Sequence, residues 1–306
     1  LPLVALASAT AAVLTLIVLG GIRQSSRVNI AIVSLTILSL LAFILAGLPL
    51  AFSKGASNLM TGGAQASGGF WPGVLHATAL MFVAYTGYGR IATLGEEVHH
   101  PRQTIPRAII VTLWFSASLY IGVAIVAVAA VGADELGTTA RTQAAPLEVA
   151  ARQFPLAGIH WIVAAGAMTA MLGVLLNLIL GLSRVLLALG RRGDMPRAVS
   201  RLDPAGATPW VAVIVVGAII IALTLIGDVK TTWSFSAFTV LIYYAITNLA
   251  ALFLPDADRL YGRWLAWAGL GACLFLAFWV EPRIWVTGLG ILGVGLIWQR
   301  LASALR

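Results

Sequence analysis

Charged side chains are scarce in this sequence. Asp, Glu, Lys and Arg make up only 10% of its 306 residues, whereas hydrophobic residues make up 60%. A water-soluble domain carries about 25% charged residues. The shortage of charge therefore argues against a soluble enzyme, a disordered chain and a fibrous protein. It indicates a polytopic membrane protein with an all-α fold.

Cysteine and acidic residues are also few. Cys273 is the one cysteine, so the chain has no internal disulfide and no thiol cluster for metal or redox chemistry. The 19 Lys and Arg residues outnumber the 11 Asp and Glu residues, which gives a net charge of +8. These cations lie between long uncharged runs, as in loops at a membrane surface. We therefore expect contact with membrane lipid and no nucleic-acid binding.

Long apolar intervals separate the charges. A bilayer core of about 30 Å is crossed by about 20 mostly apolar helical residues, and nine intervals approach or exceed that length. They are residues 3–21, 28–50, 71–95, 108–131, 159–189, 209–226, 233–254, 264–280 and 284–298. Between them we expect an external loop over residues 53–69, a short interfacial helix from Pro146 and a hairpin turn over residues 281–283.

The distribution of basic residues predicts the orientation. With alternating spans, most of the Lys and Arg residues fall on one set of loops, and the positive-inside rule places that set in the cytoplasm. The loop after the third span and the C-terminus are therefore expected in the cytoplasm, with the protein in the plasma (inner) membrane. Because the chain starts directly in an apolar run, we also expect further helices upstream of it.

The third expected span is interrupted by glycine and polar residues. It contains, in order, Ala84, Tyr85, Thr86, Gly87, Tyr88, Gly89 and Arg90. Glycine costs about 1 kcal/mol relative to alanine inside a helix, and a broken span frees backbone groups that protein, water or a ligand must satisfy. The pattern favours a discontinuous helix that binds an ammonium or a carboxylate group. The alternative is a close helix contact through small residues.

Arg90 is a second unusual feature of this span, because a cation within the membrane normally faces a cavity or a partner. Glu97 lies about two helical turns further on, beside Glu96. Three interpretations are open. The charges form a structural ion pair, which avoids leaving either charge buried alone, or an internal gate, or a site for an anionic group of a substrate.

Acidic and imidazole side chains gather just after this span. They are Glu96, Glu97, His99 and His100. We do not expect a metal site, because the zinc motif His-Glu-x-x-His is absent and Pro101 ends the helix. An intramembrane enzyme that uses this cluster is a competing hypothesis, although no nucleophile or metal set accompanies it. The isolated His76 and His160 are expected to form hydrogen bonds at the opposite membrane border.

Three groups of residues resemble segments of one transporter family. The first comprises Phe82-Val83-Ala84-Tyr85-Thr86-Gly87-Tyr88, Glu96-Glu97-Val98, Pro101-Arg102 and Ile105-Pro106-Arg107-Ala108-Ile109. The second comprises Gly21-Ile22-Arg23 and Ser26-Arg27-Val28-Asn29, and the third Ser183-Arg184, Ala188, Arg191 and Asp194-Met195-Pro196. They resemble, in this order, the sixth-helix signature, the loop between helices four and five, and the end of helix eight in amino acid-polyamine-organocation (APC) superfamily permeases.

The resemblance implies a leucine-transporter-like fold of twelve helices in two inverted five-helix repeats. On this register the chain holds helices four to twelve and lacks the first three. Residues 1–306 would form a single, partial permease domain, with the second repeat over 71–254 and the last two helices over 255–306. The implied function is secondary active transport of amino acids by alternating access. A truncated remnant that does not transport is the alternative.

The resemblance also implies roles for individual residues. Residues 84–89 would be the unwound half of the substrate site, with backbone carbonyls receiving the substrate ammonium group and with Tyr85 and Tyr88 as walls or gates. The family often has an acidic or small polar residue at the position of Gly89 and a small residue at that of Arg90. These departures favour neutral or acidic amino acids over cationic ones.

The coupling ion is left open between sodium and protons, and no other cofactor is expected. Proton-coupled members have a lysine midway along helix five, where this chain has Thr36. Thr36 and Thr169 are candidate oxygen ligands for sodium. Alternatively, the two hydroxyls are hydrogen-bonded to their own helix backbone. The sequence does not indicate an oligomeric state.

Overall fold

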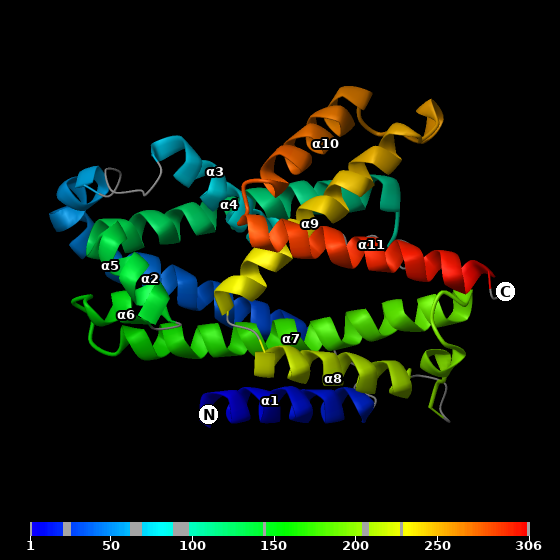
Figure 1. Ribbon diagram of the computed structural model, residues 1–306. Helices are drawn as coiled ribbons and strands as arrows, with labels where there is room; N and C mark the ends of the chain where they lie inside the picture. Colours follow the sequence, from blue (N-terminus) through cyan, green and yellow to red (C-terminus); the bar gives the residue numbers. More distant parts are fainter. Residues whose placement is uncertain are drawn as a thin grey trace. The chain divides into compact units, whose positions relative to one another are not determined.

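The computed structural model describes residues 2–20, 26–61, 69–87, 98–142, 145–203, 208–226 and 229–304, and Figure 1 shows these residues folded as helices joined by turns. No strand occurs among these described residues. The all-α fold class expected from the composition is therefore confirmed.

The chain forms two compact units. One comprises residues 1–53, 134–228 and 294–306, and the other comprises residues 54–133 and 229–293. The inverted-repeat division expected from the family resemblance stays a prediction.

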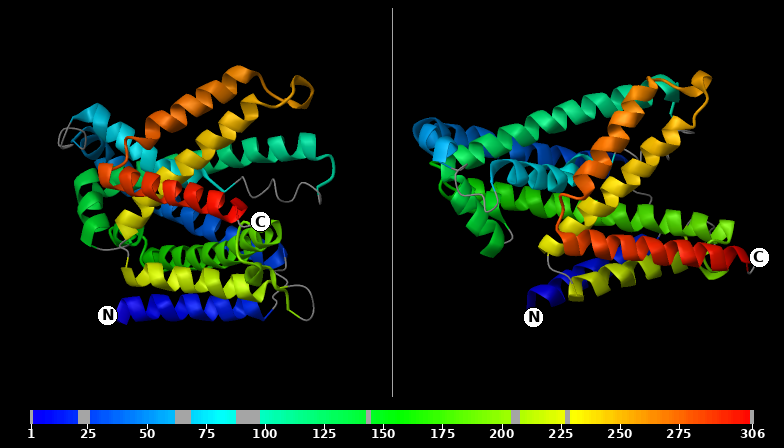
Figure 2. Two further views of the ribbon diagram at one scale, coloured as in Figure 1. Left: turned by 45° about the vertical axis from the view of Figure 1, so that its right-hand side comes forward. Right: turned by 45° about the horizontal axis from the view of Figure 1, so that its top comes forward.

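The first unit is built around the longest helices. Its elements are α1 (Pro2–Leu19), most of α2 (Ser26–Thr61), α5 (Ala133–Thr142), α6 (Pro146–Arg152), α7 (Ile159–Arg192), the short 3₁₀ helix η3 (Arg197–Ser200), α8 (Trp210–Ile226) and the end of α11 (Pro282–Ala304). Helices α1 and α8 lie side by side (Figures 1 and 2). Val18, Ile179 and Val213 form a buried core among α1, α7 and α8.

The second unit contains the interrupted span. Its elements are the end of α2, α3 (Phe70–Met81), the 3₁₀ helix η1 (Phe82–Tyr85), α4 (Pro101–Val131), α9 (Val229–Leu252), η4 (Asp256–Asp258), α10 (Arg263–Ala277) and most of α11. Its core is a cluster on α9, α10 and α11 that includes the fully buried Phe238, Leu241 and Ala277. Gly288 allows α11 close to this core, because an added Cβ would lie 2.4 Å from the ring of Phe238.

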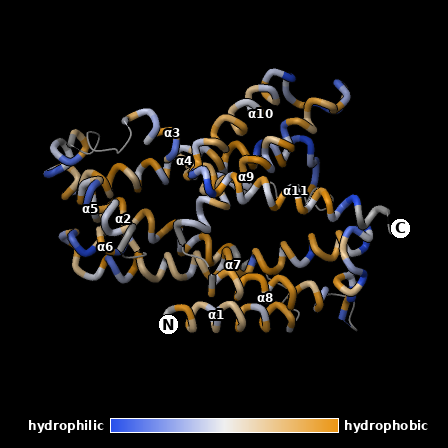
Figure 3. The backbone as a smooth tube through the Cα atoms, viewed as in Figure 1, coloured by the Kyte–Doolittle hydropathy of each residue, from blue (hydrophilic) through white to orange (hydrophobic). Residues whose placement is uncertain are grey.

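Hydrophobic residues make up much of the length of the helices, as the colours in Figure 3 show. Within the described residues, four helices are long and apolar enough to cross a membrane: Ile30–Gly55, Pro101–Val131, Ile159–Arg192 and Thr231–Leu252. Three shorter apolar helices cover Val4–Leu19, Phe70–Tyr85 and Trp210–Leu225, and α10 and α11 form a pair bent by 118°. The protein is therefore a multi-pass membrane protein, while the expected number of nine spans stays a prediction.

Two local expectations have opposite outcomes. Pro146 stands at the first turn of α6, as expected, where its missing N–H costs nothing. The loop expected from residue 53 was wrong over residues 53–61, because α2 continues to Thr61. No glycine pair interrupts the helix before Gly62, and the Asn58 side chain donates a 2.9 Å hydrogen bond to the carbonyl oxygen of Ala129 on α4. This tertiary contact gives the helix end a partner that local composition does not reveal.

Candidate functional site

The helical part of the expected third span ends within its glycine-containing segment. Helix α3 tightens into the 3₁₀ turn η1, and the backbone then becomes extended at Thr86, with φ −91° and ψ 173°. Gly87 follows with φ +110°, a conformation that side chains disfavour. An added Cβ at Gly87 would meet no atom within 4 Å, so the backbone angle and not space is what requires glycine there.

Thr86 closes the end of η1. Its backbone N–H and its hydroxyl group both donate to the carbonyl oxygen of Val83, at 3.2 Å and 2.7 Å. A carbonyl oxygen has two lone pairs, so these two bonds occupy the acceptor capacity of Val83. A ligand at the break would therefore be received by other carbonyl groups.

Tyr120 of α4 holds the same turn from the side. Its hydroxyl group donates to the carbonyl oxygen of Ala84 at 3.3 Å, and its ring meets that of Tyr85 edge to face at 5.4 Å between centroids. All three residues are half-buried. The Ala84 carbonyl has one described donor, Tyr120, so one of its lone pairs has no described partner.

Helices α9 and α10 fix the segment that precedes the break. The indole nitrogen of Trp233 donates to the carbonyl oxygen of Leu80 at 3.0 Å, and the ring of Phe82 packs edge to face on Tyr244 at 5.6 Å. A ring nitrogen of His76 lies 2.8 Å from the carbonyl oxygen of Trp279, which confirms the hydrogen bond expected for His76. Sequence reasoning missed Tyr120, Trp233 and Tyr244, because single aromatic residues in apolar helices carry no periodic signal.

The predicted site residues divide into two groups. Ala84, Tyr85, Thr86 and Gly87 lie together at the break. Tyr88, Gly89, Arg90, Glu96 and Glu97 lie outside the described residues, so the Arg90–Glu97 pair and its alternatives stay predictions.

The two histidines beyond the break lie at the start of α4. His99 and His100 are both exposed, and the His99 carbonyl oxygen accepts a 2.9 Å hydrogen bond from the Thr104 hydroxyl group. His100 has φ +51° and precedes the first residue of the helix. Among the described residues no three His, Cys, Asp or Glu side chains form a metal-binding group. Glu96 and Glu97 are not among these residues.

Thr36 and Thr169 lie in the first unit, and each is bonded to its own helix. The Thr36 hydroxyl donates to the carbonyl oxygen of Ile32 at 2.9 Å, and the Thr169 hydroxyl donates to that of Ala165 at 2.7 Å. The backbone-bonded alternative is therefore confirmed for both, although each oxygen retains lone pairs.

Two close contacts between α2 and α7 place these threonines at one level. Added Cβ atoms at Gly166 and Gly173 would lie 2.0 Å from Ser39 and 2.8 Å from Ile32 respectively. Thr36 lies between the two α2 contacts, and Thr169 lies between the two α7 contacts. The two helices therefore run antiparallel, with Thr36 and Thr169 at the same height.

Comparison with known proteins agrees with this architecture. The chain matches the amino acid permease family over residues 1–301. It is 38% identical over 294 residues to an uncharacterized transporter of Mycobacterium tuberculosis, a match that covers 95% of this chain and 64% of that protein. The chain thus spans slightly less than two thirds of that relative's length.

Two further relatives carry substrate names. The branched-chain amino acid permease BcaP of Bacillus subtilis is 30% identical over 192 residues, which cover 63% of this chain and 39% of BcaP. The vacuolar cationic amino acid transporter 4 of Arabidopsis thaliana is 27% identical over 224 residues, which cover 71% of this chain and 35% of the relative. Both are named as a transporter or permease and neither as an enzyme. With a family match over residues 1–301, the chain belongs to the amino acid permease family of the APC superfamily.

Proposed function

We propose that the protein works in secondary active transport of an amino acid by alternating access, with the substrate ammonium group bound at the end of η1. The observation that carries this proposal is the break at Thr86 and Gly87 in an otherwise apolar segment. The last carbonyl groups of a helix have no partner within it, and they carry the negative end of the helix dipole. Both properties favour a cation at this position.

The hydrogen bonds at the break select one carbonyl group. Within the described residues, Val83 accepts two hydrogen bonds from Thr86, whereas the Ala84 carbonyl has Tyr120 as its donor. The remaining lone pair of Ala84 is therefore the acceptor that we assign to the substrate ammonium group. Tyr120 is a positioning residue in this proposal, because it fixes the direction of that carbonyl.

The surroundings of the break favour a neutral amino acid. The described side chains that bond to or stack on residues 80–86 come from Tyr120, Trp233 and Tyr244, and none carries a charge. Such surroundings suit an apolar substrate side chain better than a cationic one. The name of the relative BcaP points to the same class, whereas the plant relative is named for cationic substrates.

The contacts that hold α3 against its neighbours suggest where the hinge for alternating access lies. Hydrogen bonds and ring contacts hold Leu80, His76 and Phe82 against α9 and the α10–α11 turn. Gly87 has a positive φ, and an added Cβ there would meet no described atom within 4 Å. We therefore place the hinge at Gly87, so that the chain beyond it moves while α3 stays with its neighbours.

Reconstituted transport tests this function. Full-length protein in proteoliposomes should accumulate labelled leucine, isoleucine or valine in a saturable manner, and lysine should compete weakly. The absence of uptake of any member of a broad amino acid panel would contradict the proposal and favour a non-transporting remnant. Turnover of a substrate that fell in a His100→Ala variant would instead support the intramembrane enzyme.

We propose that sodium is the coupling ion and that oxygen atoms of α2 and α7 bind it. Thr36 and Thr169 lie at one level, and their hydroxyl oxygens retain lone pairs for a hard cation. An imposed sodium gradient should then drive uptake at equal pH, and Thr36→Val should raise the sodium concentration needed for half-maximal uptake. Uptake driven equally well by a proton gradient without sodium would contradict this assignment.

The membrane orientation is a separate part of the proposal. In a Cys273→Ala background, Ser57→Cys at the end of α2 should react with an impermeant thiol reagent in intact cells. Arg197→Cys in η3 should react only after permeabilisation, because basic loops remain in the cytoplasm. The reverse labelling pattern would overturn both the orientation and the cytoplasmic C-terminus.

A further inference from the structure

A pocket of about 350 Å³ lies in the second unit between the first turns of α4 and the connection from α9 to α10. Its lining has two kinds of side chain. Arg102 and Arg107 of α4 contribute guanidinium groups, whereas Ile110, Val111, Leu260 and Tyr261 contribute apolar and aromatic surface. The pocket is separate from the helix break and plays no part in the proposed transport mechanism.

The length of α4 sets the height of this pocket in the membrane. Its 31 residues extend about 46 Å at 1.5 Å per residue, which exceeds a hydrocarbon core of about 30 Å. No charged residue occurs from Ala108 to Val131, and this stretch alone is long enough to cross the core. Arg102 and Arg107 therefore lie at the level of the lipid headgroups, with Ile110 and Val111 at the top of the acyl chains.

Aromatic residues on the other wall agree with this height. Tyr261 and Trp264, near the start of α10, are 54% and 72% exposed. Amphipathic aromatic side chains concentrate at the boundary between headgroups and hydrocarbon. Both walls of the pocket thus reach the same boundary.

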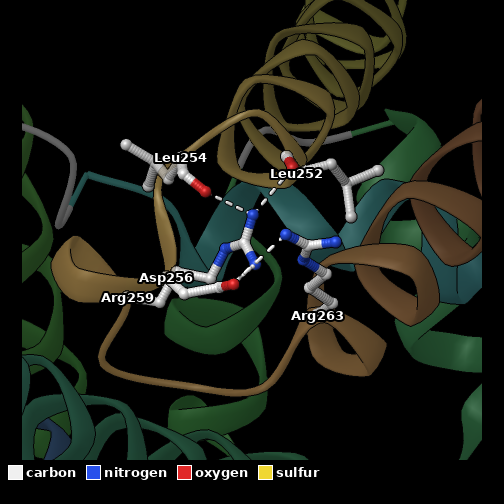
Figure 4. Close-up of polar contacts among 5 residues, drawn as sticks. All are labelled: Leu252, Leu254, Asp256, Arg259 and Arg263. Atoms are coloured by element: carbon white, nitrogen blue, oxygen red, sulfur yellow. Dashed lines mark hydrogen bonds and ion pairs between the residues drawn. The ribbon is translucent and has the colours of Figure 1, made fainter.

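The connection from α9 to α10 is held by a compact polar cluster, which Figure 4 shows. The guanidinium group of Arg259 donates to the carbonyl oxygens of Leu252 and Leu254 and pairs with Asp256. Arg263 also pairs with Asp256, at 3.2 Å. These contacts hold the connection that presents Leu260 and Tyr261, and they occupy both of its arginines.

The two arginines of α4 that line the pocket, Arg102 and Arg107, make weaker polar contacts than Arg259 does. Arg102 pairs with Asp258 at 3.0 Å and donates a long, exposed hydrogen bond to the carbonyl oxygen of Ala257 at 3.5 Å. The side chains of Arg102 and Asp258 are more than half exposed, and an exposed pair of this kind contributes little energy. Among the residues that the structure describes, none forms an ion pair or hydrogen bond with Arg107. Within the described part of the chain, the pocket therefore presents one guanidinium group without a partner and one with only exposed partners above an apolar floor.

We propose that this pocket binds an anionic phospholipid, with the phosphate of the headgroup on Arg107 and Arg102 and the upper part of an acyl chain along Ile110 and Val111. Guanidinium groups match phosphate oxygens in charge and in bidentate geometry. The volume is at the lower end of ligand pockets, which span about 300 to 1,000 Å³, so it admits a headgroup and leaves the chains in the bilayer. Basic pockets between helices at this depth recognise such lipids.

Native mass spectrometry of the detergent-purified, full-length protein tests the proposal. Phosphatidylglycerol and phosphatidylcholine with the same acyl chains are compared as probes. We expect phosphatidylglycerol to bind more tightly, and Arg107→Gln to weaken its binding about fivefold, as one lost cationic contact near the headgroups predicts. The matched control is Arg191→Gln, which removes an exposed arginine from the last turn of α7.

A second variant covers the case in which Arg107→Gln does not fold. Gln103→Glu adds a carboxylate to the pocket wall in the first turn of α4, where negative charge stabilises a helix. It should weaken phosphatidylglycerol binding to a similar extent while phosphatidylcholine binding stays unchanged.

Three results would overturn the proposal. The first is equal binding of the two lipids, which would also be the result if another part of the protein covers the pocket. The second is an equal loss in Arg191→Gln, which would indicate a general charge effect. The third is displacement of phosphatidylglycerol by an excess of sn-glycerol 3-phosphate, which would identify a site for free small anions.

Discussion

The hydroxyl group of Tyr120 donates a hydrogen bond to the backbone carbonyl oxygen of Ala84 at 3.3 Å. This bond connects the middle of α4 to the last turn before the helix break. The adjacent Val83 carbonyl already accepts two hydrogen bonds from Thr86, so the Ala84 carbonyl is the acceptor that we propose for the substrate.

Removal of the Tyr120 hydroxyl group should affect substrate affinity more than folding. Tyr120→Phe keeps the ring contact with Tyr85 and loses one hydrogen bond, which is worth about 0.5 to 1.5 kcal/mol. We expect the apparent KM for leucine uptake to rise by up to about tenfold. Tyr243→Phe is the matched control, since Tyr243 is an exposed tyrosine of α9. An equal effect of both variants would contradict a specific role for Tyr120.

Substitution at Gly87 should impair transport through backbone strain. Gly87→Ala places a side chain at φ +110°, which costs about 1 to 3 kcal/mol. We expect a marked loss of uptake rate in proteoliposomes. Gly181→Ala is the control, because Gly181 lies within α7 and an added Cβ there meets no atom within 4 Å. Normal uptake by Gly87→Ala would show that this conformation is not required.

Gly288 should be essential for the packing of the second unit. An added Cβ would lie 2.4 Å from the fully buried ring of Phe238, and such overpacking costs about 1 to 3 kcal/mol. We expect Gly288→Ala to lower the melting temperature in a detergent thermal-shift assay. Gly290→Ala, on the same helix but with open space around it, should not lower it. Equal melting temperatures for the two variants would contradict this packing.

The contact between the end of α2 and α4 should contribute to stability. Asn58→Ala removes the hydrogen bond to the Ala129 carbonyl oxygen, so the free energy of unfolding should fall by about 0.5 to 1.5 kcal/mol. Ser53→Ala removes a hydroxyl group that bonds only within its own helix, to Leu50, and should have little effect. Chemical denaturation in detergent measures both. A larger loss in Ser53→Ala would argue against the contact.

Much of the fold could be predicted from hydropathy, because each long apolar interval contains a helix in the described residues. The break was predictable from Gly87, which takes a backbone conformation that other residues disfavour. The end of α2 was not, because the helix continues through Ser- and Asn-containing sequence with the help of the contact from Asn58 to α4. Local composition does not record such a tertiary bond.

The candidate site was only partly predictable. A family resemblance identified Ala84 to Gly87, but the neighbours that orient these residues come from elsewhere in the chain. Tyr120 lies 36 positions after Ala84, and Trp233 lies 153 positions after Leu80. Their hydrogen bonds arise from helix packing, so no spacing rule within one helix reveals them.

The most direct test of the central claim combines Tyr120→Phe with a substrate analogue. Binding of leucine and of 4-methylpentanoate, which lacks the ammonium group, is measured with full-length wild-type and variant protein. We predict that Tyr120→Phe weakens leucine binding by up to about tenfold and leaves binding of the analogue unchanged, because only leucine uses the Ala84 carbonyl that Tyr120 orients. An equal loss for both ligands, or no loss for either, would contradict binding of the substrate ammonium group at Ala84.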